Sequence, residues 1–430
     1  MSHISQKFLR QFCCWVFLIF AGISHTALGQ QSESIKVMHY NLLRFGNNCD
    51  PVSINQKASW LETILNFYQP DIFTVNELLP EAAFEALIED ACQSYNPAMQ
   101  TAGFTNEAGS DIVNDLFFNS EIFGWVDVEV LPGAFRDISV YKLFVRDGIE
   151  ARSDTIFLYC IVAHLKAGGS SEDASLRLEE VQEIRSWMEN REGRGNILLL
   201  GDLNVDNARE EAWRLLVDPS ETESPNFFGF YDPIDLIEDW NGPDFASFHT
   251  QSTRTSLPDC GVDGGLDDRF DFILTSLAIM EGSQKIMYEA DSYRALGNGG
   301  GAFNQSLDCT GSEVPEILCN TLRQMSDHLP VVASFVIAPS LVSNKRAFSS
   351  LGYSIVSPFG EELQVHQTIL STNFPICIKL FSLQGKMVAY KDYKSHTSNY
   401  RLDTGSLSPG VYWVQLRLSN GYSFWEKLLK

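Results

Sequence analysis

The chain has 430 residues, of which 44% are hydrophobic, and this length suits one large globular domain with a smaller companion. Residues 30–339 hold 19 Lys and Arg against 50 Asp and Glu, a net charge of −31, whereas residues 340–430 have a net charge of +5. A field this negative repels phosphate polymers, so it argues against tight binding of nucleic acid without bound cations or a local basic patch.

The N-terminal segment has the pattern of a cleaved secretory signal. Two basic residues precede the apolar run 12–23, and a small-x-small site ending at Gly29 follows it. The run is too short to span a bilayer comfortably, and no later stretch approaches ~20 uninterrupted apolar residues. We therefore expect residues 1–29 to be a signal peptide and the mature chain to start near Gln30, with no transmembrane segment.

Two strands with polar ends open the large domain, which we assign to residues 30–339. Residues 35–42 predict a strand that reaches Asn41, and residues 71–75 predict a second strand followed by Glu77. Between them, apolar side chains at helical spacing predict a helix over residues 54–68. Further strands are predicted at 112–119, 138–145 and 155–163, and a helix with Pro at its start at 80–91.

The strand over 155–163 ends at His164, and a capping-box pattern then predicts a long helix over residues 170–190. Residues 196–200 form an uncharged apolar run that predicts a strand buried on both faces. Asp202 and Asn204 follow this strand, two residues apart, and can point at one place beyond the strand end, where ligands of layered α/β proteins collect. An Asx turn after a structural strand is the alternative interpretation.

Polar residues lie at or just before the start of the remaining predicted strands of the large domain. Residues 269–275 predict a strand that carries Asp271, and an Asp-His pair introduces a strand over 331–337. Residues 297–301 are rich in Gly but lack the Lys-Ser/Thr of a phosphate-binding loop, so we expect a surface loop there.

These strand ends supply residue types that suit phosphoester chemistry. Hard cations such as Mg²⁺ take carboxylate and amide oxygens, which Glu77, Asp327 and Asn41 can provide. A histidine paired with a carboxylate makes an oriented general base, as His328 and Asp271 can. A metal that neutralises a phosphate while a positioned base activates water is the minimum for phosphoester hydrolysis.

Six segments of residues 35–337 resemble, in order and spacing, the motifs of the endonuclease/exonuclease/phosphatase superfamily, which includes deoxyribonuclease I-like enzymes, neutral sphingomyelinases and inositol phosphatases. The resemblance implies an α/β fold of two packed mixed β-sheets flanked by helices, a four-layer sandwich with the active site at one edge. His164 with the two residues after it is similar to the deoxyribonuclease I and sphingomyelinase branches. The segments are VMHYNLL, PDIFTVNEL, VAHLKAG, LLLGDLN, RFDFILTS and SDHLPV.

The resemblance also implies catalytic roles. Asn204 would bind the scissile phosphate, and Asp202 would orient or deprotonate the attacking water or serve the leaving oxygen. Asp271 would orient His328. His164 would be a phosphate ligand or general acid.

The same resemblance makes Glu77 the principal metal ligand, assisted by Asn41, with Asp327 as a further ligand. The cofactor would be Mg²⁺, with Mn²⁺ or Ca²⁺ as alternatives. Arg254 and Arg269 are candidates for contact with a phosphate, and a surface ion pair is the alternative for each. We expect the nearby His39 to be a packed strand residue rather than a ligand.

The sequence therefore predicts a secreted metal-dependent phosphoesterase, most simply a phosphodiesterase or nuclease that hydrolyses P–O bonds by attack of water. Its partner would be a phosphodiester substrate, with nucleic acid as one candidate. Sphingomyelinase-like cleavage and phosphomonoester hydrolysis stay open, as does a non-catalytic binding protein on the same fold. The sequence does not indicate the oligomeric state.

Seven cysteines follow the signal, and export permits disulfides. We expect Cys49 to pair with Cys92 and Cys309 with Cys319. Cys160 lies within an apolar strand and is expected to be a buried small hydrophobe.

The composition changes after residue 339. Residues 340–362 are rich in Ser and are interpreted as a linker and the start of a second module, and β-prone runs separated by turns predict a small β-sandwich over 363–430. The segments PFGEEL, IKLFSLQGK, LSPGVY and KLLK resemble a type IX secretion sorting domain. The resemblance implies recognition by secretion machinery and a final location outside the cell or on its outer surface.

Overall fold

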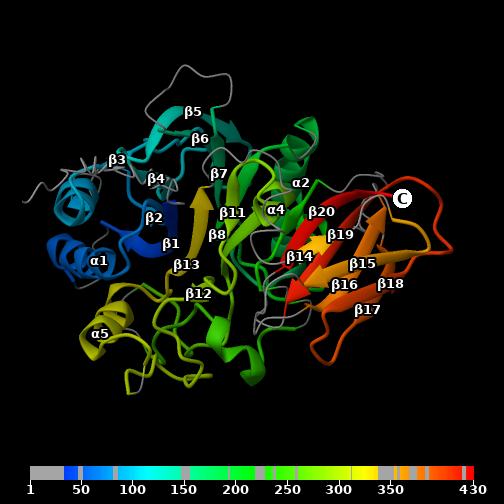
Figure 1. Ribbon diagram of the computed structural model, residues 1–430. Helices are drawn as coiled ribbons and strands as arrows, with labels where there is room; N and C mark the ends of the chain where they lie inside the picture. The colour runs from blue at the N-terminus through cyan, green and yellow to red at the C-terminus, as the bar shows by residue number, and fades with distance from the viewer. Residues whose placement is uncertain are drawn as a thin grey trace, which may run out of the picture. The chain divides into compact units, whose positions relative to one another are not determined.

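The structure is a computed structural model (Figure 1). The predicted signal peptide lies outside the residues that it describes. These are residues 33–46, 52–80, 86–146, 155–191, 194–217, 228–234, 236, 239–256, 260–310, 312–337, 353–355, 359–367, 375–382, 387–418 and 423–430.

The first sheet of the large domain is mixed, and its centre is formed by the strands that end at the predicted site. Strands β1 and β2 run parallel, whereas β1 and β13 run antiparallel. Within the described residues, this sheet has seven strands in the order β11 (Ile286–Tyr288), β13 (Val331–Ile337), β1 (Glu33–Phe45), β2 (Ile72–Leu78), β4 (Val113–Asn119) and β3 (Met99–Thr101), with β12 (Arg294–Ala295) paired to β13.

The second sheet is also mixed. Strands β7 and β8 are parallel, and β10 is antiparallel to β8. The order of the six described strands is β5 (Phe123–Leu131), β6 (Ile138–Val145), β7 (Phe157–His164), β8 (Asn196–Asp202), β10 (Asp271–Ser276) and β9 (Phe230–Tyr231).

The alternation of β8 shows how the layers pack. Leu198 and Leu200 belong to the core between the two sheets, whereas Ile197 and Leu199 belong to the core between the second sheet and its helices. Helices α1 (Ile54–Tyr68) and α5 (Glu316–Met325) and the π-helical η1 (Ala86–Gln93) cover the outer face of the first sheet; α2 (Ser171–Asn190) and α3 (Glu211–Val217) cover that of the second (Figure 1). The short helices η3 (Pro243–Phe248) and α4 (Leu277–Glu281) complete the domain.

These layers confirm the predicted α/β sandwich, and most predicted elements lie close to their expected positions. The capping box that starts α2 is present, with Ser170 and Asp173 bonded reciprocally. Strand β5 was not predicted. It is an edge strand with a largely exposed face, so Asp127 and Glu129 alternate with apolar residues and no continuous apolar run marks it.

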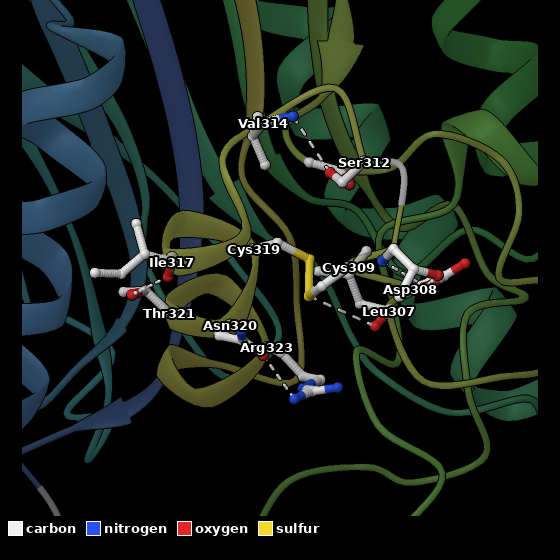
Figure 2. The surroundings of a disulfide bond; sticks show 12 residues. Leu307, Asp308, Cys309, Ser312, Val314, Ile317, Cys319, Asn320, Thr321 and Arg323 are labelled. Atoms are coloured by element: carbon white, nitrogen blue, oxygen red, sulfur yellow. Dashed lines mark hydrogen bonds between the residues drawn. A yellow bond between two sulfur atoms is a disulfide. The ribbon is translucent and has the colours of Figure 1, made fainter.

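One of the two expected disulfides is present. Cys309, in the loop before α5, is bonded to Cys319 on that helix with a Cα–Cα distance of 5.5 Å (Figure 2). The expected pair of Cys49 with Cys92 is wrong, because Cys92 is a free thiol buried between η1 and the first sheet. Cys160 is free and buried, as predicted.

The C-terminal module is an all-β structure with its own apolar core, which confirms the predicted β-sandwich. Among the described residues, one sheet contains β14 (Tyr353–Ile355), β15 (Glu362–Gln367) and β18 (Asn399–Asp403). The other contains β17 (Met387–Asp392), β16 (Pro375–Ser382), β19 (Val411–Leu418) and β20 (Ser423–Leu429).

Among the residues that the structure describes, no helix has both the length and the apolar character needed to cross a membrane.

Candidate active site

Neighbouring strands of the second sheet place three of the predicted residues in one row. His164 at the end of β7 is in register with Asp202 at the end of β8, and Asp202 is in register with Asp271 at the start of β10. The row follows from the pairing, because β7 and β8 end where the antiparallel β10 begins. All three side chains are buried.

The first sheet contributes Asn41 and Glu77 from its parallel strands β1 and β2. Asn41 is the last residue of β1 before the regular pairing with β2 is interrupted, and Glu77 is next to the end of β2. The Asn41 amide donates to Oε1 of Glu77 at 3.1 Å and to Oδ2 of Asp202 at 3.0 Å. Asn41 therefore joins the two sheets at their common edge. The second carboxylate oxygen of Glu77 accepts the backbone N–H of Arg44 at 3.0 Å.

His328 lies between two carboxylates of the second sheet. Its Nδ1 is 2.7 Å from Oδ2 of Asp271, and its Nε2 is 3.6 Å from Oδ2 of Asp202. Burial alone would lower the pKa of His328, but Asp271, Asp202 and Asp327 together outweigh it and raise that pKa well above its ordinary value. At neutral pH the imidazolium is therefore favoured.

Asp202 occupies the centre of the site. Burial raises the pKa of its carboxyl to about 7, and Asp271 adds to this effect while the His328 charge and the Asn41 hydrogen bond oppose it. Its backbone N–H donates to the Asn76 side chain at 2.8 Å. A carboxyl with this pKa can exchange a proton near neutral pH.

His164 contacts the same carboxylate from the other side, with Nε2 3.6 Å from Oδ2 of Asp202. Burial, then Arg136 and the other two histidines of the site, lower the pKa of His164 well below its ordinary value. His164 is therefore neutral, in contrast to His328.

Asn204 and Glu77 both have left-handed backbone conformations, with φ of 50° and 59°. Asn adopts this region readily, whereas Glu does so at an energetic cost that is typical of functional sites. The Asn204 side chain donates to the carbonyl of Leu165 at 3.3 Å, and its N–H donates to Asp202 Oδ1 at 3.2 Å. These bonds hold Asn204 beside the row.

Asp327 is placed differently from the expected ligands. Its Oδ2 accepts the backbone N–H of Val262 at 2.7 Å and lies 3.4 Å from the Gln251 amide nitrogen. Among the described residues, no hydrogen bond joins it to Asn41 or Glu77. Its carboxylate is next to His328 but already has protein donors.

The donor set fits a hard divalent cation. At the sheet edge the Glu77 and Asp202 carboxylates share the Asn41 amide nitrogen as a donor, and carboxylate oxygens are ligands that Mg²⁺ or Ca²⁺ prefers. The Asn41 amide oxygen accepts the backbone N–H of Leu43 at 3.0 Å. Ligand atoms of Asp202, Asp271 and His328 also lie within 4.8 Å of one another. The oxygen set is the better fit, because Nδ1 of His328 already bonds Asp271.

Two residues of the site were not predicted. The amide nitrogen of Gln251 lies 2.7 Å from Nε2 of His328 and 3.4 Å from Oδ2 of Asp327. Arg136 donates to the carbonyls of His164 and Leu165 at 3.0 and 2.9 Å. Neither lies in a strand, so no periodicity or strand end identifies it.

The two arginines suggested for phosphate contact differ. Arg269 is fully buried and bonds Asp232 through two nitrogens at 2.8 and 2.9 Å, so its assignment as a phosphate contact is wrong. The pair is a buried ion pair rather than the surface pair considered as its alternative. Arg254 is half-buried in the segment that carries Gln251.

Residues 357–430 match the family of secretion system C-terminal sorting domains. This module is a secretion sorting domain. This match confirms the sorting-domain family that was predicted from the C-terminal segments. No curated protein matches the chain in sequence.

The chain is similar to solved structures of endonuclease/exonuclease/phosphatase proteins, the superfamily that its motifs resemble. A family member from Bacteroides thetaiotaomicron is 16% identical, with 72% of this chain and 100% of that chain covered and a TM-score of 0.44. A humanized D. rerio TDP2 is 13% identical, with 70% of this chain and 98% of that chain covered and a TM-score of 0.42. The human nocturnin catalytic domain with bound sulfate is 15% identical, with 71% of this chain and 97% of that chain covered and a TM-score of 0.43. Likenesses at this level carry no information about substrate.

Proposed function

We propose that the protein is a secreted, divalent-metal-dependent phosphoesterase that hydrolyses phosphodiesters, as a nuclease or a related phosphodiesterase. The observation that carries this proposal is the meeting of two groups at one edge of the sandwich. The first is the pair of carboxylates, Glu77 and Asp202, joined by the Asn41 amide, and the second is the hydrogen-bonded pair of His328 and Asp271.

The metal site would lie at Glu77 and Asn41. A divalent cation held there supplies a Lewis acid that offsets the charge of a phosphate. The domain's net charge of −31 repels a phosphodiester, which needs local positive charge to approach. The charge of a bound cation would provide it. A metal site there would therefore allow an acidic domain to act on an anionic substrate.

The protein residues would divide the proton chemistry. Asp202, with its pKa of about 7, is suited to take a proton from the attacking water. His328, held by Asp271, keeps its proton and presents positive charge to a phosphate oxygen. Asn204 and His164 flank Asp202 and offer an amide and a neutral imidazole as further contacts.

The sorting domain supports a location outside the cell for the proposed chemistry. We infer export by the type IX route, with the mature enzyme released or held at the outer surface. The predicted signal peptide over residues 1–29 would provide the first step of this export. Secretion argues for a substrate found outside the cell, such as extracellular nucleic acid or lipid.

The test uses the mature chain, residues 30–430, stripped of metal with a chelator. It is assayed on plasmid DNA, RNA, sphingomyelin vesicles, a generic phosphodiester and a generic phosphomonoester, with and without Mg²⁺, Mn²⁺ or Ca²⁺. His328→Ala is the control. Metal-dependent cleavage of a diester that is lost in the variant supports the proposal. Cleavage of the monoester alone, or no cleavage at all with metal bound, overturns it.

A further inference from the structure

The Asp271 carboxylate faces a second histidine that the proposed chemistry does not use. While Oδ2 of Asp271 bonds His328, its Oδ1 has no hydrogen-bond partner and lies 3.7 Å from Nε2 of His39. That nitrogen also has no hydrogen-bond partner. Both side chains are fully buried, so neither atom is in contact with bulk water.

His39 reaches this position because of its place on β1. It lies two residues before Asn41 on the same face of the strand, and that face turns toward the second sheet, where β10 begins with Asp271. On the other side of the ring, Nδ1 lies 3.0 Å from the hydroxyl of Thr74 on β2. The ring is thus held between Thr74 and Asp271.

The surroundings determine which ring nitrogen carries a proton. A lone pair on Nε2 would face a buried carboxylate oxygen, and two acceptors without donors are costly in a water-free interior. A proton on Nε2 instead points at Asp271, and Nδ1 then accepts from the Thr74 hydroxyl, which can donate. Of the two neutral tautomers, only this one gives every atom a complementary neighbour.

We propose that His39, protonated at Nε2, is a positioning residue that supports the free oxygen of Asp271 and so keeps its other oxygen directed at His328. Asp271, at the start of β10 in the second sheet, then lies between two imidazoles from the side of the first sheet, His39 on β1 and His328 just before β13. The distance of 3.7 Å exceeds that of a hydrogen bond, so the support is electrostatic and steric. The kinetic consequence rests on the proposed phosphoesterase function, whereas the protonation of Nε2 does not.

The first test needs no activity. In protein with ¹⁵N-labelled histidine, long-range ¹H–¹⁵N correlation spectra distinguish protonated from unprotonated ring nitrogens, and His39→Gln assigns the His39 signals. The expected result is a protonated Nε2. An unprotonated Nε2 with a protonated Nδ1 would overturn the inference, because Nε2 would then repel Asp271.

The second test separates positioning from simple packing. His39→Ala is compared with Val37→Ala, which removes a buried side chain from the same face of β1 within the core between the sheets. His39→Ala is expected to lower kcat about tenfold with little change in KM, as the loss of an outer supporting partner does. His39→Gln, which keeps an N–H donor, should recover several-fold. Equal kcat for both alanine variants, or no recovery with Gln, overturns the inference.

The two tests also separate this inference from the function beneath it. If the wild-type chain cleaves none of the substrates, the proposed function fails, and the His39 spectrum alone then decides the inference. If the wild type is active, both tests apply, and a failure of His39 leaves the proposed function standing.

Discussion

His328 and Asp271 are joined by a contact of 2.7 Å between Nδ1 and Oδ2, although 57 residues separate them in the chain. His328 precedes β13 of the first sheet, and Asp271 begins β10 of the second. The pair therefore crosses from one sheet to the other at the edge of the sandwich. Any change that separates the sheets there also separates the pair.

This relationship predicts that Asp271→Asn removes most of the activity. The amide keeps the shape of the side chain but loses the charge that orients His328 and favours its protonation. We expect kcat to fall about 100-fold or more, the range for loss of one group that stabilises charge developing in the transition state. Steady-state kinetics measure the effect, and circular dichroism checks that the variant is folded. Activity within about twofold of the wild type would contradict the role of the pair.

The second prediction concerns the metal. Because a ligand that binds only the folded state raises stability, Mg²⁺ at about 100 times its dissociation constant should add about 2.7 kcal/mol to the free energy of unfolding. Glu77→Gln should abolish most of this gain. Thermal unfolding with and without Mg²⁺ after chelator treatment measures both proteins.

A matched control for this prediction is Glu172→Gln, which changes an exposed carboxylate in the first turn of α2. Its response to Mg²⁺ should equal that of the wild type. If Glu77→Gln and Glu172→Gln respond alike, the cation does not bind at Glu77.

The sequence predicted the strands that carry the site because they are buried on both faces. Residues 196–200 have no charge, so their period and length identify β8, and the polar residues after it mark the strand end. The order of the motifs then indicated which strand ends belong together. The meeting of Asn41 with Asp202 required only that the two sheets pack face to face with these two residues at the same edge.

What could not be predicted depends on contacts between segments without local signals. The role of Gln251 follows from the docking of its loop against His328, and nothing in the neighbouring sequence specifies that docking. His39 was expected to be a packed strand residue, and its closeness to Asp271 depends on the spacing of the two sheets. Cys92 was mispaired because the sequence does not show that it faces the core.

The third prediction concerns the disulfide of Cys309 and Cys319. The loop before α5 contacts the segment that carries Gln251, with the Leu307 N–H donating to the Thr253 carbonyl at 2.9 Å. Replacing both cysteines with Ser should lower the free energy of unfolding by about 3 kcal/mol, the expected value for a bridge across 10 residues. Urea unfolding measures the loss.

Reducing agent provides the control for this effect. It should destabilise the wild type and leave the double Ser variant unchanged, provided that no other disulfide is reduced. Since Cys260 is also disulfide-bonded, the reduction is followed by counting free thiols. A variant as stable as the oxidised wild type would show that the bridge adds nothing.

The last prediction is a pH dependence that arises away from the proposed metal ligands. Asp115 on β4 is fully buried, and burial raises the pKa of its carboxyl to about 7, while its hydrogen bonds to Leu116 N–H and Thr101 oppose the shift. In the unfolded chain the pKa is 3.8. Between these values the folded protein keeps a proton that the unfolded chain has lost, so stability falls as pH rises. The slope approaches about 1.4 kcal/mol per pH unit.

Asp115→Asn removes this titration and keeps the size of the side chain. Relative to the wild type, the variant should therefore gain about 1 kcal/mol in free energy of unfolding for each unit of pH between 5 and 7. Urea unfolding of both proteins at pH 5, 6 and 7 measures the difference, which cancels every other titrating group that the two share. If the difference in free energy of unfolding between the two proteins stays constant from pH 5 to 7, Asp115 is ionised in the folded state over this whole range. Its charge would then be stabilised by more than the hydrogen bonds that it accepts from Thr101 and Leu116.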